Sequence, residues 1–543
     1  MDNARPKEQS VHRLHIDGYA SDGSGVARLD GMVVFVQGGI RGEECEVQLT
    51  HIGRSALWGK VKQIITPSPA RTDPQCPYYG RCGGCQYRHM DYAEELEAKR
   101  IRVEDALRRL GGADITVAPV LGAAHIDRYR NKAQFPVSPG PRIGFYRSRT
   151  HQVVDVEDCL LQSEAAARLR RAVKQWMQEW SIPGYNERTR TGLVRHVYVR
   201  TNRAGHSLCC LLINGRGVPR QAELVTALRQ AEPGLAGIVL GINESHSNVI
   251  LGERYRTLWG ADYLSDLLCG HRFQLSVPSF YQVNPDQAEV LYAKALEFSG
   301  LTGGETALDL YCGIGTITLV LASRAGMVWG AEVVPQAVDD AIRNAQQSGV
   351  ENVRFLCADA GEAARRLAAE GVRPDVICVD PPRKGLAEDV VDTIAAMAPS
   401  RVVYVSCDPG TLGRDVKRFA ARGYTLRKAA AVDMFPRTAH VETVVLLSKG
   451  EVDSKKIRVE FSLEDMDMSE FQDGATYTQI KDYVLEHSGL KVSNLYISQI
   501  KRKCGIEVGK NYNLPKSEDS RQPQCPPEKE KAIREAFKYF GMI

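Results

Sequence analysis

Long hydrophobic runs and a strong excess of charge of one sign are both missing from this chain of 543 residues. No stretch approaches the length of about eighteen apolar residues that a membrane span requires. The polar segment 1–10 also lacks the apolar core of a signal peptide. The net charge of +4 neither demands nor excludes a nucleic-acid partner. We therefore expect a cytoplasmic protein with no membrane partner.

The composition is otherwise that of a globular protein, with 43% apolar and 25% charged residues. A chain of this length is expected to form roughly two to four domains. In the cytoplasm disulfides are rare, so the 14 cysteines are expected to be ligands, nucleophiles or packed core residues.

Apolar and polar residues alternate between glycines in the N-terminal part of the chain, as in the segment 31–39. Short strands with tight turns at this spacing favour a small β-barrel, which we place at residues 1–68. Barrels of this size bind several classes of ligand, so RNA binding and a purely structural role are both open.

The next part, residues 69–271, is predicted to be a mixed α+β domain that includes a charged amphipathic helix at 91–110. Arginine and lysine recur beside aromatic residues between positions 128 and 149. Such a mixture suits a surface that contacts phosphates and bases. A solvated basic face has the same composition, so this pattern alone does not decide.

Short buried strands alternate with helices from 272 to 449, at 306–310, 327–331, 376–379 and 401–405. This βαβ order predicts an α/β fold, a Rossmann-like doubly wound sheet with its sites at the carboxyl ends of the strands. Residues 450–543 are predicted to be a small helical module without a catalytic motif, either an accessory RNA contact or a capping subdomain.

A glycine-containing turn at 309–316, DLYCGIGT, follows the first of these strands. Thr318 replaces the third glycine of a dinucleotide loop, so a cofactor with a carboxylate and a ribose fits better than one with a pyrophosphate. Glu332 ends the next strand, where it is placed to accept hydrogen bonds from ribose hydroxyls, and Asp359 follows the strand after that, near the adenine edge. The pattern favours S-adenosylmethionine over NAD.

A candidate nucleophile and a candidate base lie further along the same domain. Cys407 directly follows the buried strand 401–405, so its thiol is expected at the same sheet edge. Glu442 lies in an apolar strand, where desolvation would raise its pKa towards that of a useful base; a water-exposed glutamate at a strand edge is the alternative. A thiolate that adds to C6 of uracil activates C5 towards a sulfonium methyl group, and a base must then remove the C5 proton. These parts together predict methylation of a pyrimidine carbon.

Two further patterns limit this interpretation. Asp380 is followed by two prolines, and Arg383 stands where methyltransferases acting on amino groups carry an aromatic residue, which counts against exocyclic nitrogen as the target. Cys312, Cys357 and Cys378 lie in or beside apolar runs and are expected to be core thiols.

A cysteine run with the spacing C-x5-C-x2-C is formed by Cys76, Cys82 and Cys85, and Cys159 is a candidate fourth ligand. Four cysteines can hold zinc or an iron–sulfur cluster, and the spacing does not decide between them.

Taken together, these motifs resemble the RNA uracil-5-methyltransferase family of class I, S-adenosylmethionine-dependent enzymes. The resemblance covers about residues 10–449, includes the segment 279–285 (SFYQVNP), and is closest to the iron–sulfur branch that carries a TRAM domain, an OB-like barrel, and forms 5-methyluridine in 23S rRNA. It implies that Cys407 attacks C6 and that Glu442 takes the C5 proton. It further implies contacts to the methyl donor from Gln282, Tyr311, Glu332 and Asp380, with Thr316 and Asp359 at neighbouring positions.

The resemblance also implies that the four cysteines bind a [4Fe-4S] cluster, rather than zinc, in a structural or RNA-positioning role. RNA is then the expected partner, without DNA, and the chain is expected to act as a monomer that flips its target base. Two alternatives remain: the same chemistry on transfer RNA, and a noncatalytic RNA-binding assembly factor. The barrel and cysteine run argue against the first, and the presence of both Cys407 and Glu442 argues against the second.

Overall fold

The computed structural model describes residues 6–449 except 248 and 253, together with 477–504, 506, 525–539 and 542. The chain forms two compact units, 1–452 and 453–543. In the described ranges every helix is too short or too polar to span a bilayer.

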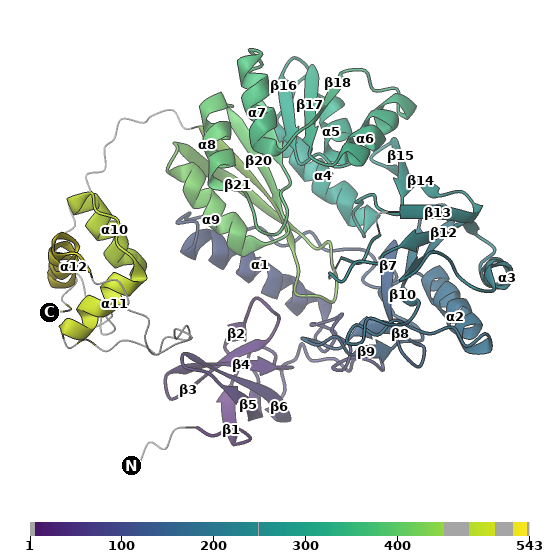
Figure 1. Ribbon diagram of the computed structural model, residues 1–543, viewed down its shortest axis with the longest axis horizontal. Helices are drawn as coiled ribbons and strands as arrows, with labels where there is room; N and C mark the ends of the chain where they lie inside the picture. Colours follow the sequence, from purple (N-terminus) through teal and green to yellow (C-terminus); the bar gives the residue numbers. More distant parts are fainter. Residues whose placement is uncertain are drawn as a thin grey trace. The chain divides into compact units, whose positions relative to one another are not determined.

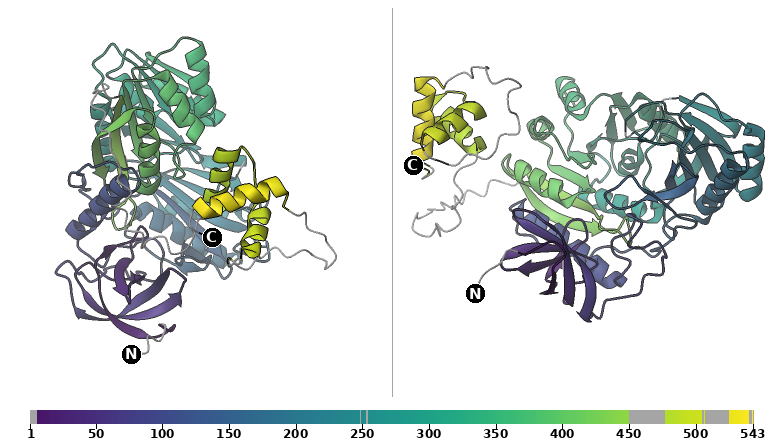
Figure 2. Two further views of the ribbon diagram at one scale, coloured as in Figure 1. Left: turned by 90° about the vertical axis from the view of Figure 1, so that its left-hand side faces the viewer. Right: turned by 60° about the horizontal axis from the view of Figure 1, so that its bottom comes forward.

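A six-stranded sheet occupies the N-terminal part of the first unit, in the order β1-β5-β6-β4-β3-β2. Its strands are β1 (Val11–His15), β2 (Gly18–Tyr19), β3 (Gly25–Leu29), β4 (Met32–Gln37), β5 (Glu44–Ile52) and β6 (Ala56–Thr66). The strands, purple in Figure 2, curl around a core of their own to which Leu14, Val34, Val47 and Leu57 contribute. A small β-sheet unit is therefore present where the sequence predicts one, and its identity as a TRAM domain stays a prediction.

The central part of the chain is built on a second sheet, in the order β13-β12-β11-β10-β7-β8-β9. Its strands are β7 (Lys132–Ser138), β8 (Arg142–Tyr146), β9 (Val153–Asp155), β10 (Val194–Thr201), β11 (Ser207–Ile213), β12 (Leu235–Ile242) and β13 (Arg254–Gly260). Helices α2 (Glu164–Glu179) and α3 (Gln221–Ala231) share an apolar core with this sheet. A hairpin of β14 (Tyr263–Leu268) and β15 (His271–Ser276) follows.

The third sheet has the order β18-β17-β16-β19-β20-β22-β21. Six strands run in the same direction, and β22 runs antiparallel to them between β20 and β21. The strands of this sheet are β16 (Thr306–Leu310), β17 (Met327–Glu332), β18 (Val353–Cys357), β19 (Val376–Val379), β20 (Arg401–Ser406), β21 (Tyr424–Val432) and β22 (Glu442–Lys449). The order reverses direction between β16 and β19, and ligands of open α/β sheets bind at such a switch point.

Helices cover both faces of this sheet (Figure 1) because successive strand residues point to opposite sides. In β20, Val402 and Tyr404 face one core, and Val403 and Val405 face the other. The first core includes residues of α1 (Tyr92–Arg109), α7 (Ala360–Ala369), α8 (Glu388–Met397) and α9 (Pro409–Ala420). The second includes residues of α4 (Pro285–Ser299), α5 (Thr316–Ala322) and α6 (Pro335–Gln347). The sheet is therefore doubly wound, as predicted. Helix α1, grouped above with the central region, packs with the α/β sheet.

The second unit contains α10 (Tyr477–Ser488), α11 (Asn494–Lys503) and α12 (Pro527–Tyr539), which enclose a small core that includes Ile480, Ile497 and Phe537. Much of the module predicted at 450–543, including 450–476 and 507–524, lies outside the described residues.

Candidate active site

Cys407 and Glu442 lie next to each other at the carboxyl edge of the α/β sheet. Strands β20 and β22 are antiparallel, and their last pair at this edge is Ser406 with Thr443. Cys407 is the residue after Ser406, and Glu442 is the residue before Thr443. Antiparallel geometry therefore places the two side by side, one step beyond the last pair. The charge of Glu442 acts directly on the Cys407 thiol, which agrees with this proximity.

Both groups are held in their neutral forms. Glu442 is 3% exposed, and burial, reinforced by the carboxylate of Asp380, raises its pKa to about 8. Burial also raises the pKa of Cys407 to about 11, and the neighbouring carboxylates of Glu442 and Asp380 add to the increase. Arg383 opposes both shifts because its positive charge favours the thiolate and the carboxylate. The site thus contains a protonated nucleophile, a buried acid–base group and a cation whose charge acts on both.

Asp380 follows β19 and joins this pair to the glycine-containing turn. Its backbone N–H donates to the carbonyl of Leu310, the last residue of β16, at 3.4 Å. Burial raises the pKa of its carboxyl to about 7. Two carboxyls with raised pKa values therefore share this edge of the sheet, which is a common sign of an active site.

The turn after β16 adopts a sequence of left-handed backbone conformations, with φ of 68° at Tyr311, 55° at Gly313 and 87° at Gly315. A left-handed tyrosine costs backbone energy, and such residues concentrate at ligand sites. The buried Asp309 carboxylate accepts a 2.6 Å hydrogen bond from the Thr318 hydroxyl, which ties the strand to the first turn of α5. The hydrogen bond therefore fixes the end of β16 relative to α5, on either side of the turn.

The acidic residues of the next two strands lie beside this turn. The carboxylate of Glu332 accepts hydrogen bonds from the backbone N–H groups of Gly313, at 3.2 Å, and Val334, at 2.9 Å. Asp359 caps α7 by accepting from the N–H of Glu362 at 2.9 Å, and its charge contributes to raising the pKa of Tyr311 to about 12. Glu332, Asp359 and Tyr311 thus surround one region above the sheet.

Gln282 and Thr316 approach from the side of α4. Gln282 is buried and its backbone carbonyl accepts from the side chain of Asn131 at 2.9 Å. The Thr316 hydroxyl lies 3.3 Å from that of Tyr292, and the charges of Asp380 and Glu442 both act on Tyr292. Thr316 is therefore connected through Tyr292 to Asp380 and Glu442, whereas the contact of Gln282 is with Asn131. Their individual roles stay predictions.

The sequence pattern did not single out Tyr292, and Arg383 counted there only as evidence against methylation of an exocyclic nitrogen. Tyr292 lies on the apolar face of α4, so its sequence pattern is that of a core residue. Arg383 is recognisable only by its position after Asp380 and two prolines. The expectation that Cys357 is a core thiol is wrong, because it is exposed at the end of the edge strand β18. Cys312 and Cys378 are buried, as expected.

The four cysteines predicted to be ligands line one cavity of about 120 Å³. Cys82 and Cys85 come from the loop 76–90, and Cys159 comes from the segment after β9. Phe145, Val156 and Leu161 supply apolar walls, and Arg88 and Arg130 supply cations. Burial raises the pKa of Cys82 to about 11 and that of Cys85 to about 12, and the thiols raise one another's pKa values further. The four cysteines predicted as ligands, which come from two distant segments of the chain, therefore line the same cavity.

A metal is not directly supported by this arrangement. Within the part of the chain that the structure describes, no group of three or more histidine, cysteine, aspartate and glutamate side chains stands close enough together to hold a metal ion. The cysteine ligand set therefore stays a prediction.

Comparison with known proteins places the geometry in a family context. A family model described as tRNA (uracil-5-)-methyltransferase matches residues 262–450. A relative from Clostridium tetani, named an uncharacterized RNA methyltransferase, is 40% identical over 446 residues, which are 81% of this chain and 97% of the relative. A relative from Halalkalibacterium halodurans, also named an uncharacterized RNA methyltransferase, is 41% identical over 445 residues, again 81% and 97% of the two chains.

A solved structure shows the same likeness in three dimensions. It is the Pyrococcus abyssi tRNA (uracil-54, C5)-methyltransferase in complex with S-adenosyl-L-homocysteine. The two proteins are 26% identical with a TM-score of 0.64, and the match covers 80% of this chain and 100% of the other.

Proposed function

Because this chain belongs to the RNA uracil-5-methyltransferase family, we propose that it forms 5-methyluridine in 23S ribosomal RNA with S-adenosylmethionine as the methyl donor. The observation that carries the proposal is the placement of Cys407 beside the buried Glu442 at the sheet edge. A thiol and a carboxyl in this relation supply both the addition to the pyrimidine ring and the later deprotonation.

The methyl donor fits the turn between β16 and α5. S-adenosylmethionine, when bound, supplies an electrophilic methyl group on its sulfonium. Glu332 is already oriented by two backbone N–H groups, so its outer lone pairs can accept from ribose hydroxyls without rearrangement. Gln282, Tyr311, Thr316, Asp359 and Asp380 complete the proposed contacts.

The protein residues act on the uracil ring in a fixed order. Cys407 gives up its thiol proton to solvent, its thiolate sulfur forms a bond to C6, and the displaced π electrons make C5 a nucleophile. C5 takes the methyl group, and the electron pair that bound this methyl group stays on the sulfur of the departing thioether. C5 then carries both a methyl group and a proton. Glu442, in its ionised form, removes that proton, the C–H electron pair restores the C5–C6 double bond, and the C6–S bond breaks with its electrons returning to sulfur. Arg383 favours the charged form of Cys407, and thereby the first step.

Ribosomal RNA is the preferred substrate because of two features outside the α/β sheet. The resemblance assigns a small barrel and a four-cysteine site to the ribosomal branch, and this chain has a six-stranded sheet and a cavity lined by four cysteines. Transfer RNA is the second candidate, since the Pyrococcus abyssi protein of known structure is a transfer-RNA enzyme by name.

Mapping of 5-methyluridine distinguishes the two substrates. We expect mass spectrometry of RNA from cells without this protein to show loss of 5-methyluridine at one or more 23S positions, restored by the wild-type chain and not by Cys407→Ala. Loss from transfer RNA alone would replace the ribosomal assignment with the second candidate. Unchanged 5-methyluridine in both RNA classes would contradict the proposed activity.

We further propose that Cys76, Cys82, Cys85 and Cys159 hold a [4Fe-4S] cluster in a structural or RNA-positioning role. The support for this proposal is that the four thiols line one cavity of about 120 Å³, whose walls include Phe145, Val156 and Leu161. Zinc, which four cysteines can also hold, is the alternative. The reaction proceeds by electron-pair movements and needs no electron from a redox centre, so the cluster is not expected to take part in it.

Elemental analysis tests this ligand set. Protein purified without oxygen is expected to contain about four irons and four sulfides per chain. Cys82→Ala is expected to lose most of both, while Cys269→Ala, which changes a half-buried cysteine outside the cavity, keeps them. Stoichiometric zinc without sulfide would contradict the cluster.

A further inference from the structure

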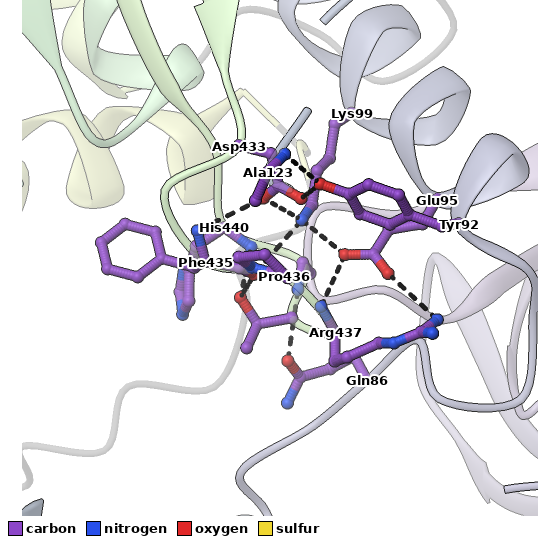
Figure 3. Close-up of polar contacts among 12 residues, drawn as sticks. Gln86, Tyr92, Glu95, Lys99, Ala123, Asp433, Phe435, Pro436, Arg437 and His440 are labelled. Atoms are coloured by element: carbon purple, nitrogen blue, oxygen red, sulfur yellow. Dashed lines mark hydrogen bonds and ion pairs between the residues drawn. The ribbon is translucent and has the colours of Figure 1, made fainter. Parts of the chain in front are cut away.

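The loop 433–441 joins β21 to β22 and ends directly at Glu442. It is therefore the segment that sets where the proposed base stands. Figure 3 shows that side chains from the segment 86–99, more than 300 residues earlier in the chain, surround this loop. His440, two residues before Glu442, feels the charge of Arg383, as do Glu442 and Cys407, so the end of the loop lies within reach of the active-site charges.

Three buried ionisable side chains fix the start of the loop. The Lys99 ammonium lies 2.7 Å from a carboxylate oxygen of Glu95 and 2.6 Å from one of Asp433, and all three side chains are 0% exposed. Lys99 also donates to the backbone carbonyl of Phe435 at 3.2 Å. The Tyr92 hydroxyl donates to the other oxygen of Asp433 at 2.8 Å. Helix α1 thus holds Asp433 through both of its carboxylate oxygens.

The middle and the end of the loop are held through backbone atoms. The N–H of Arg437 donates to Glu95 at 2.6 Å, and the carbonyl of Arg437 accepts from the backbone N–H of Gln86 at 3.0 Å. The N–H of Ala439 donates to the Gln86 side chain at 3.2 Å, and its carbonyl accepts from Arg102 at 2.5 Å. Hydrogen bonds of this kind define positions along the whole loop.

Stability alone does not account for this cluster. Removing a carboxylate and an ammonium from water is costly, and replacing a buried ion pair with apolar residues of similar volume is often neutral or stabilising. Apolar contacts, however, lack direction and leave a loop free to slide. A Lys99 ammonium that bonds two carboxylates and a carbonyl defines one position of the loop backbone.

We propose that Glu95, Lys99 and Asp433 are positioning residues for the base, which hold the loop 433–441 so that the Glu442 carboxylate can reach the proton on C5. The inference rests on the proposed function. A general base must come within about 2.6–3.2 Å of its proton partner, and a displacement near 1 Å costs about 10²-fold in rate. Cys407 stands on the β20–α9 connection, and the hydrogen bonds described for Glu95, Lys99 and Asp433 lead to α1 and to the loop 433–441, so addition and methyl transfer are expected to be affected less. Deprotonation and elimination are the steps that slow.

The test uses Asp433→Asn in the full-length protein, with total RNA from cells that lack this protein and with S-adenosylmethionine labelled in its methyl group. Asparagine keeps the volume of Asp433 and removes the charge that Lys99 binds. We expect turnover to fall about 10- to 100-fold and labelled methyl groups to accumulate in a covalent protein–RNA band on a denaturing gel. The KM for the methyl donor is expected to stay within about twofold, because the donor turn after β16 is untouched.

Two further variants keep the result interpretable. Tyr92→Phe keeps the ring and removes the hydrogen bond to Asp433, together with the one that the hydroxyl accepts from the Ala123 N–H, so a smaller accumulation of labelled adduct is expected even where Asp433→Asn folds poorly. Arg100→Ala, which removes ion pairs to Glu97 and Glu104 on the same helix, is expected to behave as wild type.

The outcomes separate this inference from the function on which it rests. If Glu442→Gln accumulates adduct while neither Asp433→Asn nor Tyr92→Phe does, the positioning role is wrong and the base assignment stands. A uniform loss of all steps that follows a lower melting temperature would also overturn the positioning role. If Glu442→Gln itself forms no adduct, the base assignment fails first.

Discussion

Cys407→Ala is expected to abolish RNA methylation, with turnover reduced by about 10⁴-fold or more, as for other enzymes that lose a covalent nucleophile. Alanine cannot form the bond to C6, and without that bond C5 of uracil is too weak a nucleophile to take a methyl group. Methyl-donor binding is expected to persist, because the Glu332 and Tyr311 region lies on other strands. Transfer of labelled methyl groups to RNA and equilibrium binding of the donor measure the two properties separately.

The thiol also predicts the pH dependence of chemical modification. Because its pKa is raised to about 11, Cys407 in the free enzyme is a thiol at neutral pH and becomes the reactive thiolate only as the pH rises. Its alkylation by iodoacetamide should therefore accelerate steadily up to about pH 10. Cys269→Ala serves as the control for turnover, since Cys269 lies in the β14–β15 turn. Methylation by Cys407→Ala at even a tenth of the wild-type rate would exclude the covalent route.

The strands and the individual reactive residues of the α/β part are recognisable in the sequence, because each strand is a short apolar run that ends at a polar residue. The run 306–310 is the same in prediction and structure, and the turn after it carries the donor motif. What the sequence does not contain is the lateral order of the strands. Only the insertion of β22 beside β20 places Glu442 next to Cys407, and this pairing depends on contacts between segments far apart in the chain.

The buried cluster of Glu95, Lys99 and Asp433 is even harder to predict from the sequence than the pairing of β20 with β22. Lys99 appears in the sequence as one of many charges on an amphipathic helix, and its partner Asp433 is 334 residues away. No local pattern distinguishes it from Arg100, which pairs at the surface of the same helix. The exposure of Cys357 is similarly a result of the edge position of β18 rather than of its apolar neighbours.

Glu442→Gln is expected to trap the enzyme on its substrate. The Cys407 thiol and the donor turn are intact in this variant, so the sulfur can add to C6 and C5 can take the methyl group. Glutamine cannot accept the C5 proton, so the C6–S bond cannot break. A covalent protein–RNA complex that carries the labelled methyl group is therefore expected, stable to denaturing electrophoresis and close to one equivalent per active enzyme, with multiple turnover reduced by about 10²–10⁴-fold.

The raised pKa of Glu442 predicts how the turnover rate depends on pH. Only the carboxylate acts as a base, and with a pKa of about 8 its ionised fraction in the free enzyme rises roughly tenfold per pH unit up to that value. Where elimination limits turnover, the wild-type rate should rise with pH and level off near pH 8, whereas the residual rate of Glu442→Gln should not follow this titration. Glu388→Gln, which changes an exposed carboxylate on α8, is expected to keep the wild-type profile.

The pH dependence of the free energy of unfolding tests independently whether Glu442 is buried as a neutral acid. A carboxyl whose pKa is higher in the folded than in the unfolded chain binds more protons when folded, so its contribution to stability declines as the pH rises from about 4.5 to about 8. Glu442→Gln removes that decline and is expected to become more stable relative to wild type over this range, by about 3–4 kcal/mol between pH 5 and pH 8. Denaturant unfolding at pH 5 and pH 8 measures the difference. A stability difference that does not change with pH would mean that Glu442 is not buried as a neutral acid, and the case for its role as the base would lose its physical foundation.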